Sequence, residues 1–294
     1  VPTVHGEKIV MRLLFQEEKL MQLPQLGLAK YILQPYLNMV NSSGGIILVT
    51  GPTGSGKTTT LYASLAEIDN EARNIITIED PVEYKLSGYS QIEVKPKVGL
   101  TFANALRSVL RQDPDVIMVG EIRDTETAQI AIQSALTGHL VFSTVHTNSA
   151  PATITRLIDM GIEPFLVSSS IIGVLAQRLV RRICPDCRKS YQPHPEQLRE
   201  LGIKEVSFRK LDRRFYRGDG CDNCRQTGYR GRIGIHELLV MSEGVKNTIL
   251  ESSDSDTIKK QGLKEKMITL RRDGVNKILY GLTTAEEILS ITSE

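Results

Sequence analysis

Short apolar runs alternate with amphipathic segments along the first two thirds of the chain. Four runs have the length and composition of buried strands, and four segments have the apolar spacing of helices. The predicted strands cover residues 46–50, 75–79, 116–120 and 140–144, and the predicted helices cover residues 58–69, 102–111, 125–135 and 150–160. This alternation predicts an α/β fold with a mostly parallel sheet and helices on both faces.

The pattern changes towards both ends. Residues 9–14 predict a strand, which a polar linker joins to a helix over residues 27–41. The chain becomes rich in Cys, Pro and Arg after Arg182, and periodic apolar positions from His236 onward predict a small helical end piece. We therefore predict four parts: a remnant of an N-terminal domain with its linker (1–23), a core (24–183), a cysteine-containing subdomain (184–235) and a helical subdomain (236–294). Since the first residues read as mid-domain, we expect a fragment whose upstream domain has been removed.

Composition is that of a globular protein, with 40% hydrophobic and 24% charged residues. No apolar run approaches the roughly 20 residues of a membrane-spanning helix. A net charge of +2 gives no electrostatic reason to expect a nucleic-acid or membrane-surface partner. No signal peptide opens the chain, so we expect a cytosolic, reducing compartment.

A glycine-rich loop joins the strand at 46–50 to the following helix. It matches the pattern G-x-x-x-x-G-K-[ST] in the strand-loop-helix context that a phosphate-binding loop requires. Backbone N–H groups and the helix N-terminus can surround a phosphate, Lys57 can reach the β- and γ-phosphates, and Thr58 can ligate Mg²⁺. An ordinary glycine turn is the weaker alternative. The expected nucleotide-binding residues are Gly51, Pro52, Thr53, Gly54, Ser55, Gly56, Lys57, Thr58 and Thr59.

Carboxylates follow two of the predicted strands. Glu121 ends the strand at 116–120, and we expect it to act through a magnesium-bound water; the alternative is a solvated Glu after a core strand. Glu79, Asp80 and Glu83 cluster after the strand at 75–79. Hydrolysis needs a group that orients or deprotonates water, and we rank Glu83 first for this role, with Glu79 and Asp80 supporting magnesium and water. An acidic surface turn remains the alternative.

Two histidines bracket the strand at 140–144. His146, at its carboxyl end, can donate a hydrogen bond to a γ-phosphate, whereas His139 can equally be structural. Arginines supplied by a neighbouring subunit often complete P-loop sites. The candidates near motif boundaries are Arg12, Arg107, Arg111 and Arg123, although most exposed arginines are simply solvated.

All four cysteines fall in two C-x-x-C pairs, Cys184 with Cys187 and Cys221 with Cys224. In a reducing compartment this spacing favours a closed, structural zinc site with four thiolate ligands, with an insertion looping out between the pairs. Two disulfides and a redox pair are the weaker alternatives. Neighbouring arginines are expected to help keep the thiolates deprotonated: Arg181, Arg182, Arg188 and Arg225.

The ordered motifs resemble the GspE/PilB family of type II secretion and type IV pilus assembly ATPases. The resemblance covers nearly the whole chain, through residues 51–60, 78–83, 111–123, 137–148 and 176–181 and both cysteine pairs. In family terms, residues 51–58 correspond to Walker A and residues 78–83 fall in the Asp box. Glu121 closes Walker B, while His139 and His146 belong to the His box.

The resemblance implies a RecA-like P-loop core and Mg²⁺-dependent ATP hydrolysis by a head-to-tail homo-hexamer. It also implies a cytoplasmic motor, peripheral to the inner membrane through platform and cytoplasmic-domain partner proteins. Family members use arginines of an N-terminal domain against the neighbour's nucleotide, and Arg12 is the candidate retained here. We therefore expect the fragment to bind ATP but to hydrolyse it poorly and assemble weakly.

The expected machine is type II secretion, powered through pseudopilus assembly, and the alternative is type IV pilus assembly. The cysteine pairs argue against a pilus retraction motor. A nucleic-acid translocase with a zinc module belongs to a different class and needs stacking aromatics. Aromatic residues are 5% and Trp is absent, so no nucleic-acid partner is expected. A scaffold that binds nucleotide without turnover is a third alternative.

Overall fold

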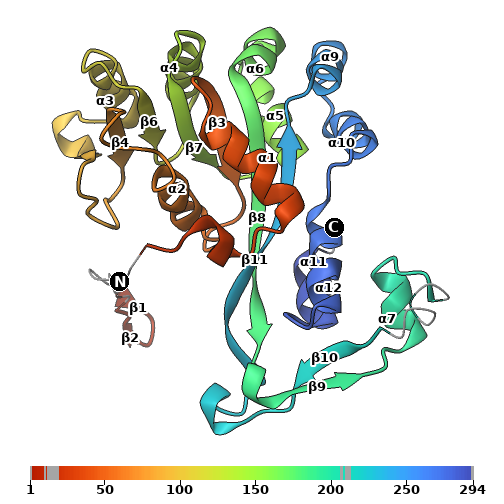
Figure 1. Ribbon diagram of the computed structural model, residues 1–294. Coiled ribbons are helices and arrows are strands. Elements are labelled where there is room, and N and C mark those ends of the chain that lie inside the picture. Colours follow the sequence, from red (N-terminus) through yellow and green to blue (C-terminus); the bar gives the residue numbers. More distant parts are fainter. Residues whose placement is uncertain (1, 10, 12–19, 206–207, 209–212, 293–294) are drawn as a thin grey trace.

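A seven-stranded sheet runs through the centre of the protein (Figure 1). The computed structural model describes residues 2–9, 11, 20–205, 208 and 213–292. Neighbouring strands run parallel, except for the last strand in sequence, which pairs antiparallel with β8 at one edge. The spatial order is β11 (Tyr229–Val240), β8 (Ile171–Ile183), β3 (Gly45–Thr50), β7 (Leu140–Val145), β6 (Val116–Val119), β4 (Ile75–Glu79) and β5 (Ser90–Glu93).

Both faces of this sheet are covered, because its central strands β3, β4, β6 and β7 are buried on both sides. In β3, Ile46 and Leu48 belong to one core cluster, whereas Ile47 and Val49 belong to the other. Helices α1 (Lys30–Val40) and α2 (Lys57–Leu65) pack on the second cluster. The first cluster is covered by α3 (Phe102–Val109), α4 (Thr125–Leu136), α5 (Ala150–Asp159) and α6 (Pro164–Ser170). The predicted α/β class with a mostly parallel sheet is confirmed.

The four predicted strands and the helices between them are all present, with ends shifted by a few residues. Three strands of this sheet were not predicted: β5, β8 and β11. Of these, β8 and β11 lie outside the alternating region and continue beyond the sheet (Figure 1). They lead into a small antiparallel sheet of β9 (Arg188–Tyr191) and β10 (Phe215–Gly218), next to α7 (Pro195–Glu200).

The C-terminal helices are α9 (Glu243–Glu251), α10 (Ser255–Lys264), α11 (Leu270–Leu279) and α12 (Ala285–Thr292). The helical end piece therefore begins at Glu243 and not at His236. Strand β11 crosses the predicted boundary between residues 235 and 236, since its apolar residues pair with β8. Four short 3₁₀ turns complete the described elements: Leu23–Leu26, Pro96–Val98, Pro185–Cys187 and Asp222–Cys224.

Near the N-terminus, β1 (Pro2–Thr3) pairs with β2 (Gly6–Glu7). The strand expected at residues 9–14 is not seen at Ile9 or Met11, and Arg12 lies outside the described residues together with most of that segment. Among the described helices, none is long and apolar enough to cross a membrane.

Candidate functional site

The glycine-rich loop connects the carboxyl end of β3 to the first turn of α2. Gly51, Gly54 and Gly56 have φ angles of +147°, +78° and +86°, which glycine adopts readily. A Cβ atom at Gly51 would lie 2.3 Å from the carbonyl oxygen of Gln177, so that backbone approach excludes a side chain. Helix α2 begins at Lys57, and its positive N-terminal end therefore faces the loop.

Lys57 is folded into the loop that precedes it. Its Nζ donates hydrogen bonds to the carbonyl oxygens of Gly51 at 2.9 Å and Pro52 at 3.1 Å. Burial lowers the pKa of Lys57, and the nearby Glu121 carboxylate opposes that shift. The loop thus holds a buried ammonium group beside the end of β6.

Gln177 fixes the loop from β8, and sequence reasoning missed this residue. Its Nε2 donates to Ser55 O at 2.7 Å, and its Oε1 accepts from Thr60 Oγ1 at 2.8 Å. The side chain is only 2% exposed. One buried amide therefore ties the loop to the first turn of α2. The available signal was the resemblance of residues 176–181 to the family motif, which assigns no contact.

A cavity of about 490 Å³ opens beside the loop, at the carboxyl ends of β3, β4, β6 and β7. This edge of a parallel sheet is where ligands bind in open α/β folds. The predicted residues that line it are Thr53, Gly54, Gly56, Lys57, Thr58, Thr59, Glu79, Asp80, Glu83, Glu121 and His146. Arg232 and Leu179 line the same cavity and were not predicted. The folded chain therefore brings the predicted loop, acids and His146 together.

Glu121 lies at the centre of the charged groups in this cavity. Its Oε1 is 2.5 Å from Arg123 Nη2, and its Oε2 is 3.5 Å from His146 Nε2. The Glu121 side chain is 14% exposed, whereas those of Arg123 and His146 are 67% and 48% exposed. The carboxylate is thus held in place while its two partners remain accessible to solvent.

Glu79 is buried and its oxygens are occupied by neighbouring side chains. It accepts from Tyr62 Oη, from Thr77 Oγ1 at 2.6 Å and from Gln91 Nε2 at 3.2 Å. Tyr62 Oη in turn accepts from Tyr84 N at 3.4 Å. Burial and the hydrogen bond to Glu79 raise the pKa of Tyr62. Glu79 therefore supports the turn that carries Glu83, and Glu83 itself is exposed at the cavity.

His139 lies at the opposite end of β7 from this cavity. Its Nδ1 contacts Ser134 O at 2.8 Å and Thr137 Oγ1 at 3.1 Å, which is a structural position. Arg107 pairs with Glu126 at 2.6 Å. Within the described part of the chain, Arg123 is the candidate arginine seen to pair with a site carboxylate.

The four cysteines converge at the base of the small sheet. Their Sγ atoms all lie within 4.8 Å of one another. The separations are 3.8 Å for Cys184 and Cys221, 3.9 Å for Cys187 and Cys224, and 3.7 Å for Cys221 and Cys224. Zn–S bonds of about 2.3 Å in a tetrahedron place sulfur atoms about 3.8 Å apart, so the four thiols fit that ion.

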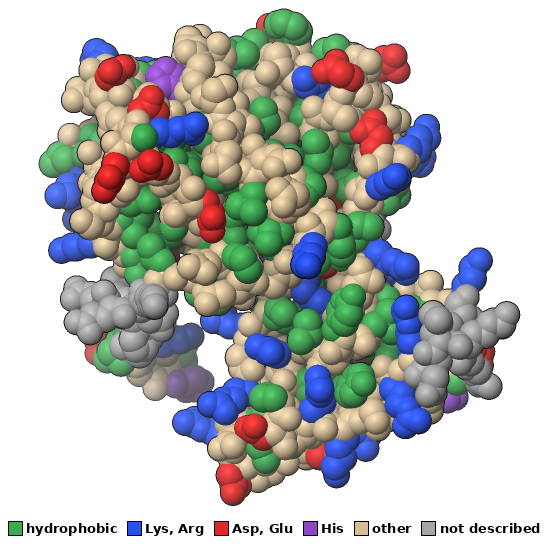
Figure 2. Space-filling view, in the orientation of Figure 1, with side chains coloured by type: hydrophobic (Ala, Val, Ile, Leu, Met, Phe, Trp, Pro, Cys, Tyr) green, Lys and Arg blue, Asp and Glu red, His purple; other side chains and the backbone are tan. Residues whose placement is uncertain are grey.

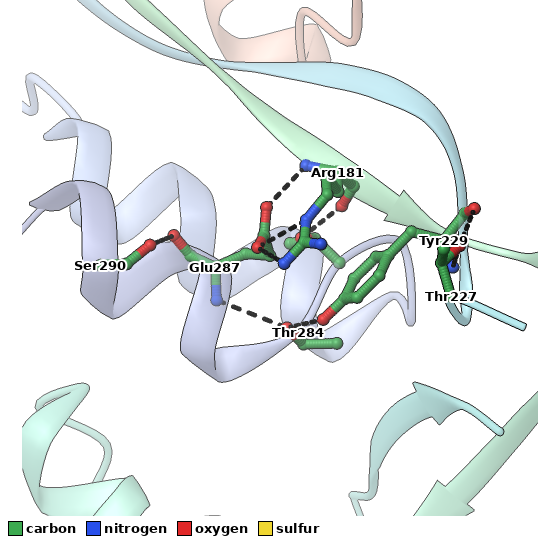
Figure 3. A network of polar contacts seen from close by, with 7 residues as sticks. Arg181, Thr227, Tyr229, Thr284, Glu287 and Ser290 are labelled. Carbon is green, nitrogen blue, oxygen red and sulfur yellow. Dashed lines mark hydrogen bonds and ion pairs between the residues drawn. The ribbon is translucent and has the colours of Figure 1, made fainter. Parts of the chain in front are cut away.

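Backbone amides favour the thiolate at one member of this cluster, Cys224. Burial raises the pKa of Cys224, but hydrogen bonds from the amides of Cys221 and Gly228 and from the thiols of Cys221 and Cys187 outweigh burial and lower it. Burial instead raises the pKa of Cys187. Of the arginines expected to assist, Arg181 binds Glu287 and Arg188 stacks on Tyr216. These two side chains therefore bind to neighbouring elements of the structure, as Figure 3 shows for Arg181.

The relatives that this chain resembles in sequence are named as secretion-system and pilus-assembly proteins. The chain is 50% identical to the type II secretion system protein E of Dickeya dadantii, over all of this chain and 58% of that protein. It is also 50% identical to the type IV pilus assembly ATPase PilB of Thermus thermophilus, over all of this chain and 33% of that protein. The chain thus spans little more than half, or less, of the length of these relatives.

Solved structures agree with the fold. The pilus retraction motor PilT with bound ADP superposes with a TM-score of 0.70 at 30% identity, covering 95% of this chain and 69% of PilT. The ATPase DotB of Legionella pneumophila, at 24% identity, has a TM-score of 0.66 over 92% of this chain and 65% of that one, and supports the fold alone. Residues 1–290 match the family model described as "Type II/IV secretion system protein". The resemblance drawn from the sequence motifs is confirmed, and the chain belongs to this family.

Proposed function

We propose that this chain binds and hydrolyses Mg²⁺-ATP as part of a homo-hexameric motor that powers type II protein secretion through pseudopilus assembly. The observation that carries the proposal is the convergence of Lys57, Glu83 and Glu121 on one cavity beside the glycine loop. Family membership supports the same activity. The motor would act in the cytoplasm, against inner-membrane platform and cytoplasmic-domain proteins of the secretion machine.

Each residue has a defined part in this proposal. Loop amides and Lys57 would bind the β- and γ-phosphates, and the Thr58 hydroxyl would be a ligand of Mg²⁺. Glu83 orients or deprotonates the attacking water, and Glu79 positions the turn that carries it through Tyr62. Glu121 would help hold Mg²⁺ through a bound water, and the ion would neutralise charge on the phosphates.

Two residues extend the proposal to the γ-phosphate and to the subunit boundary. His146, 3.5 Å from Glu121, donates to the γ-phosphate and reports its presence. Arg12 of one subunit acts on the nucleotide of its neighbour.

Two substitutions separate binding from chemistry. Lys57→Ala should abolish binding of a fluorescent ATP analogue, because the buried ammonium group is lost. Glu83→Gln should preserve the dissociation constant within about twofold and lower kcat by about 10²–10⁴-fold. Glu67→Gln, on the exposed turn after α2, is the matched control for a lost carboxylate. Normal turnover by Glu83→Gln would remove Glu83 from the mechanism, and a scaffold without turnover would show binding alone.

Type IV pilus assembly is the alternative function, and it is supported by the 50% identity to PilB, which equals the identity to the type II secretion protein. The two machines are distinguished by complementation. Two chimeras join this chain to the N-terminal domains of one or the other relative. The chimera with the domains of the type II secretion protein should restore secretion in a strain that lacks the secretion motor. The chimera with the domains of PilB should not restore piliation in a strain that lacks PilB.

A nucleic-acid translocase predicts that DNA stimulates hydrolysis. Residues 184–235 contain 12 Lys or Arg against 7 Asp or Glu, a net charge of +5. Figure 2 shows Lys and Arg side chains gathered over the lower part of the molecule, where β9 and β10 lie. That positive charge by itself would cause salt-sensitive DNA binding without any effect of DNA on hydrolysis. Turnover that DNA leaves unchanged is therefore the expected result, and stimulation would favour the translocase.

A further inference from the structure

A second cavity, of about 640 Å³, lies where the loop after β7 meets β8, β11 and the C-terminal helices. It is larger than the cavity beside the glycine loop, and among the described residues the two share no lining side chain. Its volume is within the range of small-molecule sites, roughly 300–1,000 Å³.

Strand β8 separates the two cavities, since successive side chains of a strand point to opposite sides. Gln177 holds the glycine loop and Leu179 lines the nucleotide cavity. Arg178, between them, lines the second cavity instead. The second cavity is therefore not an extension of the nucleotide site.

Charged side chains give the second cavity a positive wall. Among the described residues, the lining includes the cations Arg178, Lys259 and Arg271 and one carboxylate, Glu237, which together carry a net charge of +2. Glu237 is 3% exposed and accepts from the backbone N–H groups of Ala150 at 2.9 Å and Leu270 at 3.3 Å. These hydrogen bonds tie the Glu237 carboxylate to the first turns of α5 and α11.

The two guanidinium groups are bound to neutral acceptors. Arg178 donates to Ile291 O at 2.5 Å and to Asn148 Oδ1 at 3.2 Å. Its Nε is buried and has no acceptor within the described part of the chain. Arg271 donates from Nη2 to Thr292 O at 2.9 Å, from Nε to Thr292 Oγ1 at 3.3 Å and from Nη1 to Glu200 O at 3.4 Å. Neither is seen to form an ion pair with a described carboxylate, so both retain positive charge that an anion would neutralise.

We propose that this cavity binds a phosphate-bearing small molecule, whose oxygens accept hydrogen bonds from Arg178 and Arg271. Guanidinium groups present planar forks that match phosphate oxygens, and Lys259 adds a third positive charge. A ligand with several negative charges would neutralise these three cations more completely than a ligand that carries only one carboxylate group. Contacts to the end of α12 would remain, since each guanidinium has more N–H groups than these contacts use.

Inorganic pyrophosphate is the probe, titrated by calorimetry into full chain that carries Lys57→Ala so that the glycine loop contributes little. We expect saturable binding that Arg178→Lys and Arg271→Gln each weaken by at least about tenfold, through loss of the fork or of the charge. Arg272→Gln is the matched control: Arg272 neighbours Arg271 but lines other cavities, and binding should stay within about twofold.

Arg178 and Arg271 also hold the end of α12, so the thermal midpoint of each variant is measured. Where a midpoint falls, Lys259→Gln decides, because Lys259 lies on α10; it should still weaken pyrophosphate several-fold. No binding by the Lys57→Ala protein, or binding that all three cavity substitutions leave unchanged, would overturn the proposal. Equally tight binding of malonate would overturn the phosphate class.

Discussion

At the scale of single residues, Gln177 is the side chain that holds the glycine loop in place from another strand, β8. Gln177→Leu keeps the volume but removes both hydrogen bonds, leaving Ser55 O and Thr60 Oγ1 without that partner. We expect a loss of about 1–3 kcal/mol in the free energy of unfolding, as for buried groups left unsatisfied. Affinity for an ATP analogue should fall about tenfold, because binding must then order the loop.

Chemical denaturation and fluorescence titration measure the two effects of Gln177→Leu. Gln129→Leu, on the exposed side of α4, is the control and should change neither quantity appreciably. A Gln177→Leu protein with unchanged affinity would show that the loop is ordered by its own sequence.

Gln177 also shows which part of the site could not be predicted from the sequence. Residues 51–58 could be assigned because glycines, Lys57 and the flanking elements are local in the chain and obey one pattern. Gln177 contacts Ser55 across 122 positions, and no local pattern encodes that contact. Arg232 likewise reaches the cavity from β11. The acids and His146 were predictable because each lies at or within a few residues of the carboxyl end of its own strand.

At the scale of elements, β8 connects the sheet to the C-terminal helices. Arg181 on β8 binds Glu287 on α12 through Nε at 2.9 Å and Nη2 at 2.6 Å, and its guanidinium lies 4.1 Å from the ring centre of Tyr229 (Figure 3). Tyr229 Oη in turn contacts Thr284 Oγ1 at 3.0 Å. The strand that clamps the glycine loop is therefore also fastened to the last helix.

This contact predicts a pH-dependent stability. Burial raises the pKa of Glu287, but hydrogen bonds from Arg181 outweigh it and leave the pKa below its ordinary value. Stability from a depressed carboxyl pKa is present above the unfolded-state pKa, near 4.5, and is lost as pH falls through the folded value. Glu287→Gln should lower the thermal midpoint by a few degrees at pH 7. The difference from wild type should shrink as pH falls below about 4.5 and vanish once pH lies below the folded-state pKa of Glu287.

Thermal scans from pH 3 to pH 8 test this prediction. Glu286→Gln is the matched control, because Glu286 is exposed and adjacent. A difference between Glu287→Gln and wild type that stayed constant down to pH 3 would assign the effect to packing and not to the ion pair.

Strands β8 and β11 also show why part of the fold was not predictable. Residues 171–176 form a continuous apolar run, and periodicity cannot distinguish such a run from a buried helix. The strand β11 is stabilised by pairing with β8, as in Ile235 with Arg178, across more than 50 positions. Residues from His236 onward were therefore assigned to helices, whereas the strands with helices between them were recognised from their alternation.

At the scale of the whole molecule, the cysteine cluster begins directly after β8, which ends at Ile183 and leads towards β9 and β10 (Figure 1). It closes the subdomain in which Phe208 and Phe215 pack edge to face and join the large core cluster together with Leu198 and Leu201. Small subdomains of this kind usually need a metal or disulfides for stability. The proposed zinc ion would therefore stabilise β9 and β10 without contacting the nucleotide.

Cys221→Ser tests that division of roles. Metal analysis should find one zinc ion per wild-type chain and none in the variant, and the thermal midpoint should fall because a ligand of the proposed site is lost. Hydrogen exchange should increase first at β9 and β10, while the dissociation constant for an ATP analogue stays within about twofold. Asn223→Ser, between the second pair of cysteines, leaves all four sulfurs and should retain the metal. A parallel loss of nucleotide affinity in Cys221→Ser would instead mean that β8 transmits the state of the cluster to Gln177 and the glycine loop.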